Sequence, residues 1–246
     1  MKTYLSSSLA LALLFIFSSC QKEVQSRPVS FKETTYNFLG PYDAYGTPDY
    51  LLARDVISPD MLSFINSIIP DQSDLRKTHP ELLGSSAIAD IRITQEADVY
   101  LTYVSHGAGE SNAIAFYTYP TNSAPASAKD IEVITYAYPN ASSKTKLVAG
   151  DKVLLGRFQP GTSIGFVLMQ AAWDGTTQTL NNEAVHFCSN DVLNPEVNVN
   201  LKKHAVLIDY SAENITLIGF EDLDRTDEHC DNDFNDVVLY TTVVPN

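Results

Sequence analysis

From Ile88 to the end of the chain, apolar residues recur with a period of two, and no segment with helical spacing intervenes. This alternation is typical of β-strands with one buried face. Turn residues separate nine segments rich in Val, Ile, Tyr, Phe and Thr, which we expect to be strands: 89–94, 99–105, 113–119, 131–138, 152–158, 163–172, 205–210, 215–220 and 236–244. Without crossover helices between them, the sequence predicts an all-β fold over residues 86–246, an antiparallel β-sandwich of jelly-roll type.

The first 19 residues have the organisation of a secretory signal peptide. Lys2 precedes an apolar run from Leu9 to Phe17, and small residues lead into Cys20. A membrane-spanning helix needs about 20 apolar residues, which this run does not reach. The end of the run resembles the lipobox of bacterial lipoproteins, in which the cysteine is lipidated. We therefore expect Cys20 to carry lipid and residues 20–30 to form a flexible tether.

The residues after Cys20, Gln21-Lys22-Glu23, resemble the surface-export signals of Bacteroidetes lipoproteins. The expected location is the outer membrane, with the mature chain facing either the cell surface or the periplasm. The formal net charge is -14, and such an acidic surface repels phosphate backbones. The expected partners are thus the membrane, through the lipid, and a glycan or surface protein, but not nucleic acid.

Residues 31–85 read as an irregular segment that contains one helix. Ser58 is a predicted N-cap, Pro59 occupies the first helical position and Asp60 lies near the positive end of the helix dipole. Apolar residues then follow at helical spacing until Pro70: Met61, Leu62, Ile65, Ile68 and Ile69. The sequence predicts a short N-terminal helical segment that docks onto the sandwich.

Two cysteines follow Cys20, namely Cys188 and Cys230. Disulfides persist in exported proteins, and a bridge that closes a loop of this length contributes about 4 kcal/mol in the chain-entropy model. Two free buried thiols are the other possibility. The sequence leaves both open, because it does not give the distance between the two Cα atoms.

Four sequence blocks carry a family resemblance: "SNAIAFYTYP", "LVAGDKVLLGRFQPGTSIGFVLMQAAWDG", "HFCSNDVLNPE" and "LIGFEDLDRTDEHCDNDFNDVVLYTT". They occur in order between Ala89 and Val244 and are similar to the LruC-type lipoprotein domain. That domain belongs to the wider group catalogued as domain of unknown function 4114. The resemblance implies an extracytoplasmic β-sandwich and assigns no reaction.

The segment between the last two predicted strands is strongly acidic. It contains eight carboxylates: Glu221, Asp222, Asp224, Asp227, Glu228, Asp231, Asp233 and Asp236. Ca²⁺ takes six to eight oxygen ligands, and the spacing Asp231-x-Asp233-x-Asn235 places alternate side chains on one side of a loop, with Phe234 turned toward the core. The loop is not an EF-hand, because Asp236 and Thr242 stand where that motif needs Gly and Glu.

We expect a Ca²⁺ site in this loop rather than a Zn²⁺ site, since no Cys or His pair has zinc-site spacing. The predicted ligands are Glu221, Asp222, Asp231, Asp233, Asn235 and Asp236. The alternative is a solvated acidic hairpin whose Asp and Asn side chains cap backbone groups.

No catalytic residues are predicted. Ser163 lies within a Gly-x-Ser-x-Gly pattern, but a turn precedes it and a predicted strand follows, whereas a nucleophile elbow needs a strand and then a helix. Trp173 at a predicted turn is the expected exposed contact for a ligand. The leading hypothesis is a non-catalytic, Ca²⁺-binding surface module for a glycan or protein. The alternatives are a glycan-degrading hydrolase that uses clustered carboxylates and a purely structural envelope lipoprotein.

Overall fold

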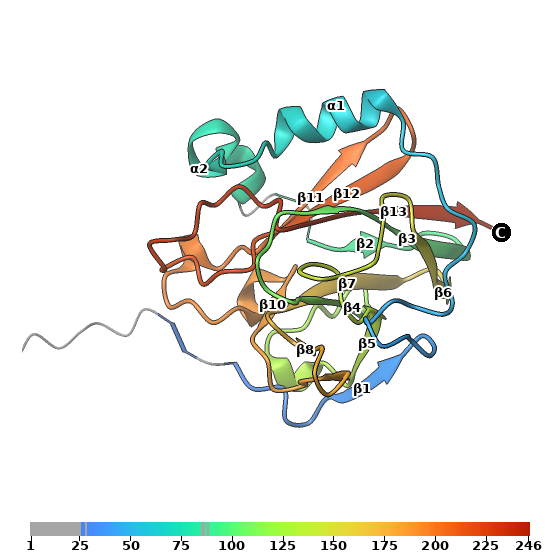
Figure 1. The fold of residues 1–246 in the computed structure, drawn as a ribbon, viewed down its shortest axis with the longest axis horizontal. Coiled ribbons are helices and arrows are strands. Elements are labelled where there is room, and N and C mark those ends of the chain that lie inside the picture. The colour runs from blue at the N-terminus through green and yellow to red at the C-terminus, as the bar shows by residue number, and fades with distance from the viewer. Residues whose placement is uncertain (1–25, 28, 85–86, 88) are drawn as a thin grey trace, which may run out of the picture.

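The computed structural model describes residues 26–27, 29–84, 87 and 89–246, which form a sandwich of two β-sheets (Figure 1). The six-stranded sheet has the order β1-β5-β4-β7-β10, with β2 also paired to β7. Its strands are β1 (Thr35–Phe38), β2 (Ile91–Arg92), β4 (Ala113–Pro120), β5 (Val133–Tyr138), β7 (Thr162–Met169) and β10 (His186–Cys188).

The five-stranded sheet has the order β11-β12-β13-β3-β6. Its strands are β3 (Ala97–His106), β6 (Lys152–Phe158), β11 (Ala205–Tyr210), β12 (Ile215–Phe220) and β13 (Val237–Pro245). A separate hairpin pairs β8 (Trp173–Asp174) with β9 (Thr179–Leu180). The pairing is antiparallel throughout the described residues except between β1 and β5, so the predicted all-β sandwich is confirmed.

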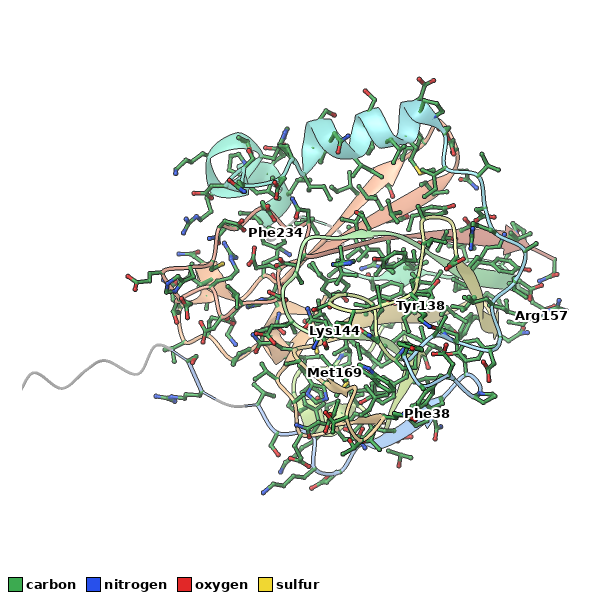
Figure 2. The ribbon with its side chains drawn as sticks, viewed as in Figure 1. Phe38, Tyr138, Lys144, Arg157, Met169 and Phe234 are labelled. Atoms are coloured by element: carbon green, nitrogen blue, oxygen red, sulfur yellow. The ribbon has the colours of Figure 1, made fainter. Side chains whose placement is uncertain are left out.

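The main hydrophobic core fills the space between the two sheets. Leu101 and Leu239 from the five-stranded sheet and Ile114 and Phe166 from the six-stranded sheet belong to it, and all four are fully buried. Tyr138 lies in the middle of the molecule (Figure 2), where its hydroxyl donates to the carbonyl of Leu101 at 2.7 Å. Inward-facing apolar residues from both sheets thus make the packing that their alternation predicts.

Both sheets are also covered on their outer faces. Phe31 and Ile131 pack on the outer side of the six-stranded sheet, against residues such as Tyr117 and Val167. Because both of its faces are covered, β7 is buried along nearly its whole length instead of alternating.

The helix α1 (Pro59–Ile68) covers the outer face of the five-stranded sheet and crosses β11 and β12 in Figure 1. Ser58 caps it as predicted, since its Oγ accepts the Met61 N–H at 3.0 Å. Met61 and Ile65 are buried, whereas Leu62, placed on the apolar stripe by the sequence pattern, is 43% exposed. The remaining helical turns are α2 (Leu75–Thr78) and the 3₁₀ segments η1 (Pro80–Leu83), η2 (Ala128–Asp130), η3 (Asp191–Leu193) and η4 (Val199–Leu201).

Part of the predicted irregular segment, residues 31–85, is a strand. β1 pairs in parallel with β5, with Thr35 opposite Val133 and Phe38 opposite Tyr136. It occupies the edge of the six-stranded sheet. The sequence does not predict this strand, because its four residues are mostly exposed and show no detectable alternation of apolar and polar residues.

Candidate metal centre

The acidic loop, residues 221–236, connects β12 to β13 at one end of the five-stranded sheet. Its two ends are held close to β12 and β11: the Asp236 N–H donates to the Phe220 carbonyl at 3.0 Å, and the Glu221 N–H to the His204 carbonyl at 2.9 Å. Phe234 has a left-handed backbone with φ of 59°. Its side chain is fully buried in the cluster that contains Met61 of α1, as the sequence predicts (Figure 2).

The loop gathers five of the six predicted ligands into two groups of carboxylates. One group consists of Glu221, Asp231 and Asp233, and the other of Glu221, Asp222 and Asp236. Within each group, one oxygen per residue lies within 4.8 Å of the others. Glu221 belongs to both groups.

These carboxylates are largely removed from water and lack positive partners. Glu221 is 1% exposed, Asp233 2% and Asp222 4%, whereas Asp231 is exposed. No Lys, Arg or His in the described part of the chain forms an ion pair with any of the five. The Glu221 Oε2 atom is buried and has no hydrogen-bond partner among the described residues. An arrangement of this kind is costly unless a cation completes it or the carboxylates are protonated.

Arg225 is a buried cation in the same loop, but it forms no ion pair with the grouped carboxylates, and its Nη2 has no hydrogen-bond partner among the described residues. Its Nε donates to Asn232 Oδ1 at 2.8 Å and its Nη1 to the Lys203 carbonyl at 2.9 Å. The guanidinium also lies over the Phe234 ring, 5.2 Å from the centroid. Arg225 therefore fixes the shape of the loop and leaves the carboxylates unpaired.

Hydrogen bonds from other elements orient the carboxylates. Asn112 Nδ2 donates to Asp222 Oδ2 at 2.6 Å, and the Asp222 N–H donates to Asp236 Oδ2 at 2.8 Å. The Gln72 N–H donates to Asp233 Oδ2 at 2.7 Å. Asp222 Oδ2 and Asp236 Oδ2 each keep a second lone pair, so these bonds fix the direction of the two groups and leave them able to bind a cation.

Asn235, the sixth predicted ligand, contacts another member of the site directly. Its side-chain Nδ2 donates to Asp233 Oδ2 at 2.8 Å, and its N–H donates to Asp233 Oδ1 at 3.0 Å. Its Oδ1 lies against Gly107, where an added Cβ would approach it to 2.7 Å. Asn235 thus holds Asp233 in position. Sequence reasoning missed Asn112, Gln72 and Gly107, since no local motif links them to the loop.

Burial, and after it the crowding of carboxylates, raises the pKa values of Glu221, Asp222, Asp233 and Asp236. Burial, followed by repulsion from Asp222 and Glu221, raises the pKa of Asp236 to about 9. Burial and the neighbouring acids raise the pKa of Glu221 to about 7. The pKa values of Asp222 and Asp233 are also raised, chiefly by burial. A bound cation would favour the ionised forms and reverse these shifts.

Cys188 and Cys230 are free and buried, so the disulfide that the sequence left open is not formed. Cys188 lies in β10 on the outer side of the six-stranded sheet, packed with residues such as Val167, whereas Cys230 lies in the acidic loop. Burial raises the pKa of both thiols, and the Glu221 carboxylate raises that of Cys230 further. Each thiol is held in a different part of the fold.

The prediction that Trp173 is exposed is wrong: its side chain is only 6% exposed. The segment before the helix folds over it, so that the Tyr42 ring meets it edge-on at 5.6 Å between centroids. Trp173 nevertheless lines a cavity of about 710 Å³ together with Tyr45, Ser111, Lys144 and Asp174. Burial by a segment more than a hundred residues away in sequence could not be read from the local turn pattern.

Ser163 lies inside strand β7, is fully buried and donates to Thr121 Oγ1 at 3.1 Å. No helix follows it, so the Gly-x-Ser-x-Gly pattern is a turn into a strand, as the sequence context predicts. The predicted signal peptide and Cys20 lie outside the described residues. Among the described residues, no helix has the length and apolar character needed to span a membrane.

The fold and this loop together define an all-β sandwich domain with a candidate cation site at one end. Residues 158–243 match the family model described as Domain of unknown function (DUF4114). The match includes the whole acidic loop, β12, and β13 except for its last two residues. No curated protein and no solved structure gives a significant match to the chain.

Proposed function

We propose that this chain is a lipid-anchored, extracytoplasmic β-sandwich whose acidic loop binds Ca²⁺ and which acts as a non-catalytic surface module for a glycan or protein. The observation that carries the proposal is Glu221. Its carboxylate is buried, has one oxygen without a hydrogen-bond partner among the described residues, and belongs to both groups of acids. A divalent cation supplies the charge and the bonds that this carboxylate lacks.

The donor set favours Ca²⁺ over Zn²⁺. All five grouped side chains offer carboxylate oxygen, which suits hard cations, whereas zinc sites use thiolate and imidazole. Cys230 lies in the same loop but belongs to neither group of candidate ligands. Mg²⁺ needs a tighter octahedral shell and keeps several waters, which suits a rigid cluster of buried carboxylates less well.

The cavity beside Trp173 supports a binding role. Its volume of about 710 Å³ falls in the usual range for ligand pockets, and it combines the aromatic residues Trp173 and Tyr45 with polar side chains. Aromatic rings stack on the apolar faces of sugars and anchor protein partners. None of the five grouped carboxylates lines this cavity, which favours binding there over acid-base hydrolysis.

Asn112 connects the cavity to the acidic loop. Its Nδ2 donates to Asp222 at 2.6 Å, and its Oδ1 accepts the Ala171 N–H at 2.9 Å. A second hydrogen bond links the neighbouring residues: the Trp173 N–H donates to the Ser111 carbonyl at 3.0 Å. A cation on Asp222 would therefore stabilise the segment that forms the cavity wall, and partner binding should depend on Ca²⁺.

Thermal unfolding tests the metal part of the proposal. A cation at a hundred times its dissociation constant stabilises the folded state by about 2.7 kcal/mol, or about 5–10 °C in Tm for a chain of this size. EGTA should lower Tm, Ca²⁺ should restore it more effectively than Mg²⁺, and Glu221→Gln, which changes the carboxylate common to both groups, should remove most of the response. An unchanged Tm in EGTA, with no bound metal by elemental analysis, would overturn the proposal.

A glycan array, probed with and without Ca²⁺, tests the binding part. Tyr45→Ala is the matched variant, since Tyr45 lines the cavity and is 48% exposed, so that its loss should leave the core intact. Binding that requires Ca²⁺ and is weakened by Tyr45→Ala supports the proposal. If Tyr45→Ala leaves binding unchanged, the ligand does not bind in this cavity.

A further inference from the structure

We infer that the acidic loop holds two divalent cations, with Glu221 as the carboxylate shared between them. This inference rests on the proposed Ca²⁺ function and specifies its site. The inner position is formed by Glu221, Asp222 and Asp236, and the outer position by Glu221, Asp231 and Asp233. The Oε2 atom of Glu221, in a side chain that is 1% exposed, has no hydrogen-bond partner among the described residues and is a free ligand atom.

The size of the Ca²⁺ coordination shell assigns the two groups of carboxylates to separate ions. Ca²⁺ binds oxygen at about 2.3–2.6 Å, so two oxygens on opposite sides of one ion are about 5 Å apart at most. The oxygens in each group meet this limit, since they lie within 4.8 Å of one another. In the described part of the chain the two groups have only Glu221 in common. Asp231 and Asp233 therefore belong to one ion, and Asp222 and Asp236 to the other.

The charge of the loop fits two ions better than one. The two groups contain five carboxylates, and no described Lys, Arg or His pairs with them. One divalent ion would leave an excess of three negative charges in a largely buried cluster. Two ions leave an excess of one, which the exposed side of the loop can solvate.

The two positions are supported by different elements. Asp222 of the inner position is held by Asn112, just before β4, whereas Asp233 of the outer position is held by the Gln72 N–H between α1 and α2. The inner ion would therefore tie the loop to the sandwich. The outer ion would tie it to the helical segment that covers the five-stranded sheet.

The two positions also differ in their access to solvent. The inner position has Glu221 and Asp222 buried and Asp236 half-buried, whereas Asp231 of the outer position is exposed. An exposed ligand lets water reach the ion and lets the ion leave without opening the fold. The outer ion should therefore exchange faster than the inner one.

Equilibrium dialysis of the full chain in detergent, against radioactive Ca²⁺, counts the ions directly. Wild type should bind two ions per chain. Asp231→Asn should bind one, because it removes a charged ligand from the outer position only; this side chain is exposed, so the variant should fold. Asp222→Asn should also bind one and keeps an oxygen to accept the Asn112 hydrogen bond.

Glu228→Gln is the matched control, because it removes an exposed charge from the same loop but lies outside both groups. It should still bind two ions. A single ion on wild type would overturn the two-ion inference and leave the proposed Ca²⁺ site standing. No ion on wild type would overturn both. Loss of both ions in Asp231→Asn would contradict the separation into two positions.

Discussion

At the scale of single residues, the protonation of Glu221 and Asp236 decides how the loop behaves without a cation. Burial raises their pKa values to about 7 and about 9, whereas both carboxyls titrate near pH 4 in an unfolded chain. Between about pH 4 and pH 9 these two carboxyls therefore bind more protons in the metal-free folded protein than in the unfolded chain. Their contribution to the free energy of unfolding is highest at the lower end of this range and falls as pH rises through the folded-state pKa values.

This predicts opposite responses to pH with and without the metal. In chelator-stripped buffer, Tm should fall between pH 5 and pH 8. With saturating Ca²⁺ the fall should largely disappear, because the ion binds the deprotonated carboxylates, and the stabilisation by Ca²⁺ should grow with pH. Melting curves over a pH series measure both effects. Glu221→Gln should flatten the metal-free profile, and equal slopes with and without Ca²⁺ would contradict the prediction.

At the scale of elements, the loop is positioned by the close contact between β12 and the backbone of Phe234. A Cβ added to Gly219 of β12 would lie 2.3 Å from the Phe234 carbonyl oxygen and 3.1 Å from Ile69 Cδ1. Glycine is therefore required at this position of the strand, although it weakens strands in general. The same contact fixes the backbone next to Asp233 and Asn235.

Gly219→Ala should accordingly destabilise the protein by about 1–3 kcal/mol, as expected for overpacking against backbone. It should also weaken Ca²⁺ binding, because Phe234 must move and carries the neighbouring Asp233 with it. Gly109→Ala is the control: nothing lies within 4 Å of its added Cβ, and its effect should stay within about 0.5 kcal/mol. Chemical denaturation and Ca²⁺ titration of both variants provide the comparison. Equal stability of the two variants would show that Gly219 is not a packing constraint.

At the scale of the whole molecule, the start of the described chain is attached close to the end of the sandwich that carries the acidic loop. Ser26 pairs with Glu196, and the Arg27 N–H donates to the Pro195 carbonyl at 2.7 Å. The buried Glu196 in turn contacts His204 Nε2 at 2.6 Å, and His204 Nδ1 lies 3.1 Å from the Glu221 carbonyl. The proposed tether would therefore join the domain on the side that carries the proposed metal site.

If Cys20 carries the lipid, Cys20→Ala should release the protein from membranes. Buried acyl chains contribute about 0.8 kcal/mol per CH₂, far more than an acidic protein surface gains at a membrane. Fractionation of cells into membrane and soluble parts measures the change, and incorporation of labelled fatty acid into the wild type is the control. Retention of the variant in membranes, together with an unlabelled wild type, would exclude the anchor.

The sequence by itself determined the features that depend on local patterns. The bounds of β6, β11 and β12 follow from alternation over six or seven residues, and the start of α1 follows from Ser58 and Pro59. The grouping of the acidic residues of the loop also follows from a local sequence pattern. Their spacing places Asp231, Asp233 and Asn235 close together whatever the rest of the fold does, and strands β12 and β13 bring in Glu221 and Asp236.

The tertiary structure alone decided the features that depend on distant partners. These are the pairing of β1 with β5, the burial of Trp173 beneath Tyr42, the separation of Cys188 from Cys230 as free thiols, and the hydrogen bond from Asn112 to Asp222 across 110 residues. Alternation reports which face of a segment is apolar, but it does not report which segment covers that face. The division of the five carboxylates into two groups that share Glu221 also depends on the tertiary structure, because the folded sheets determine where each oxygen lies.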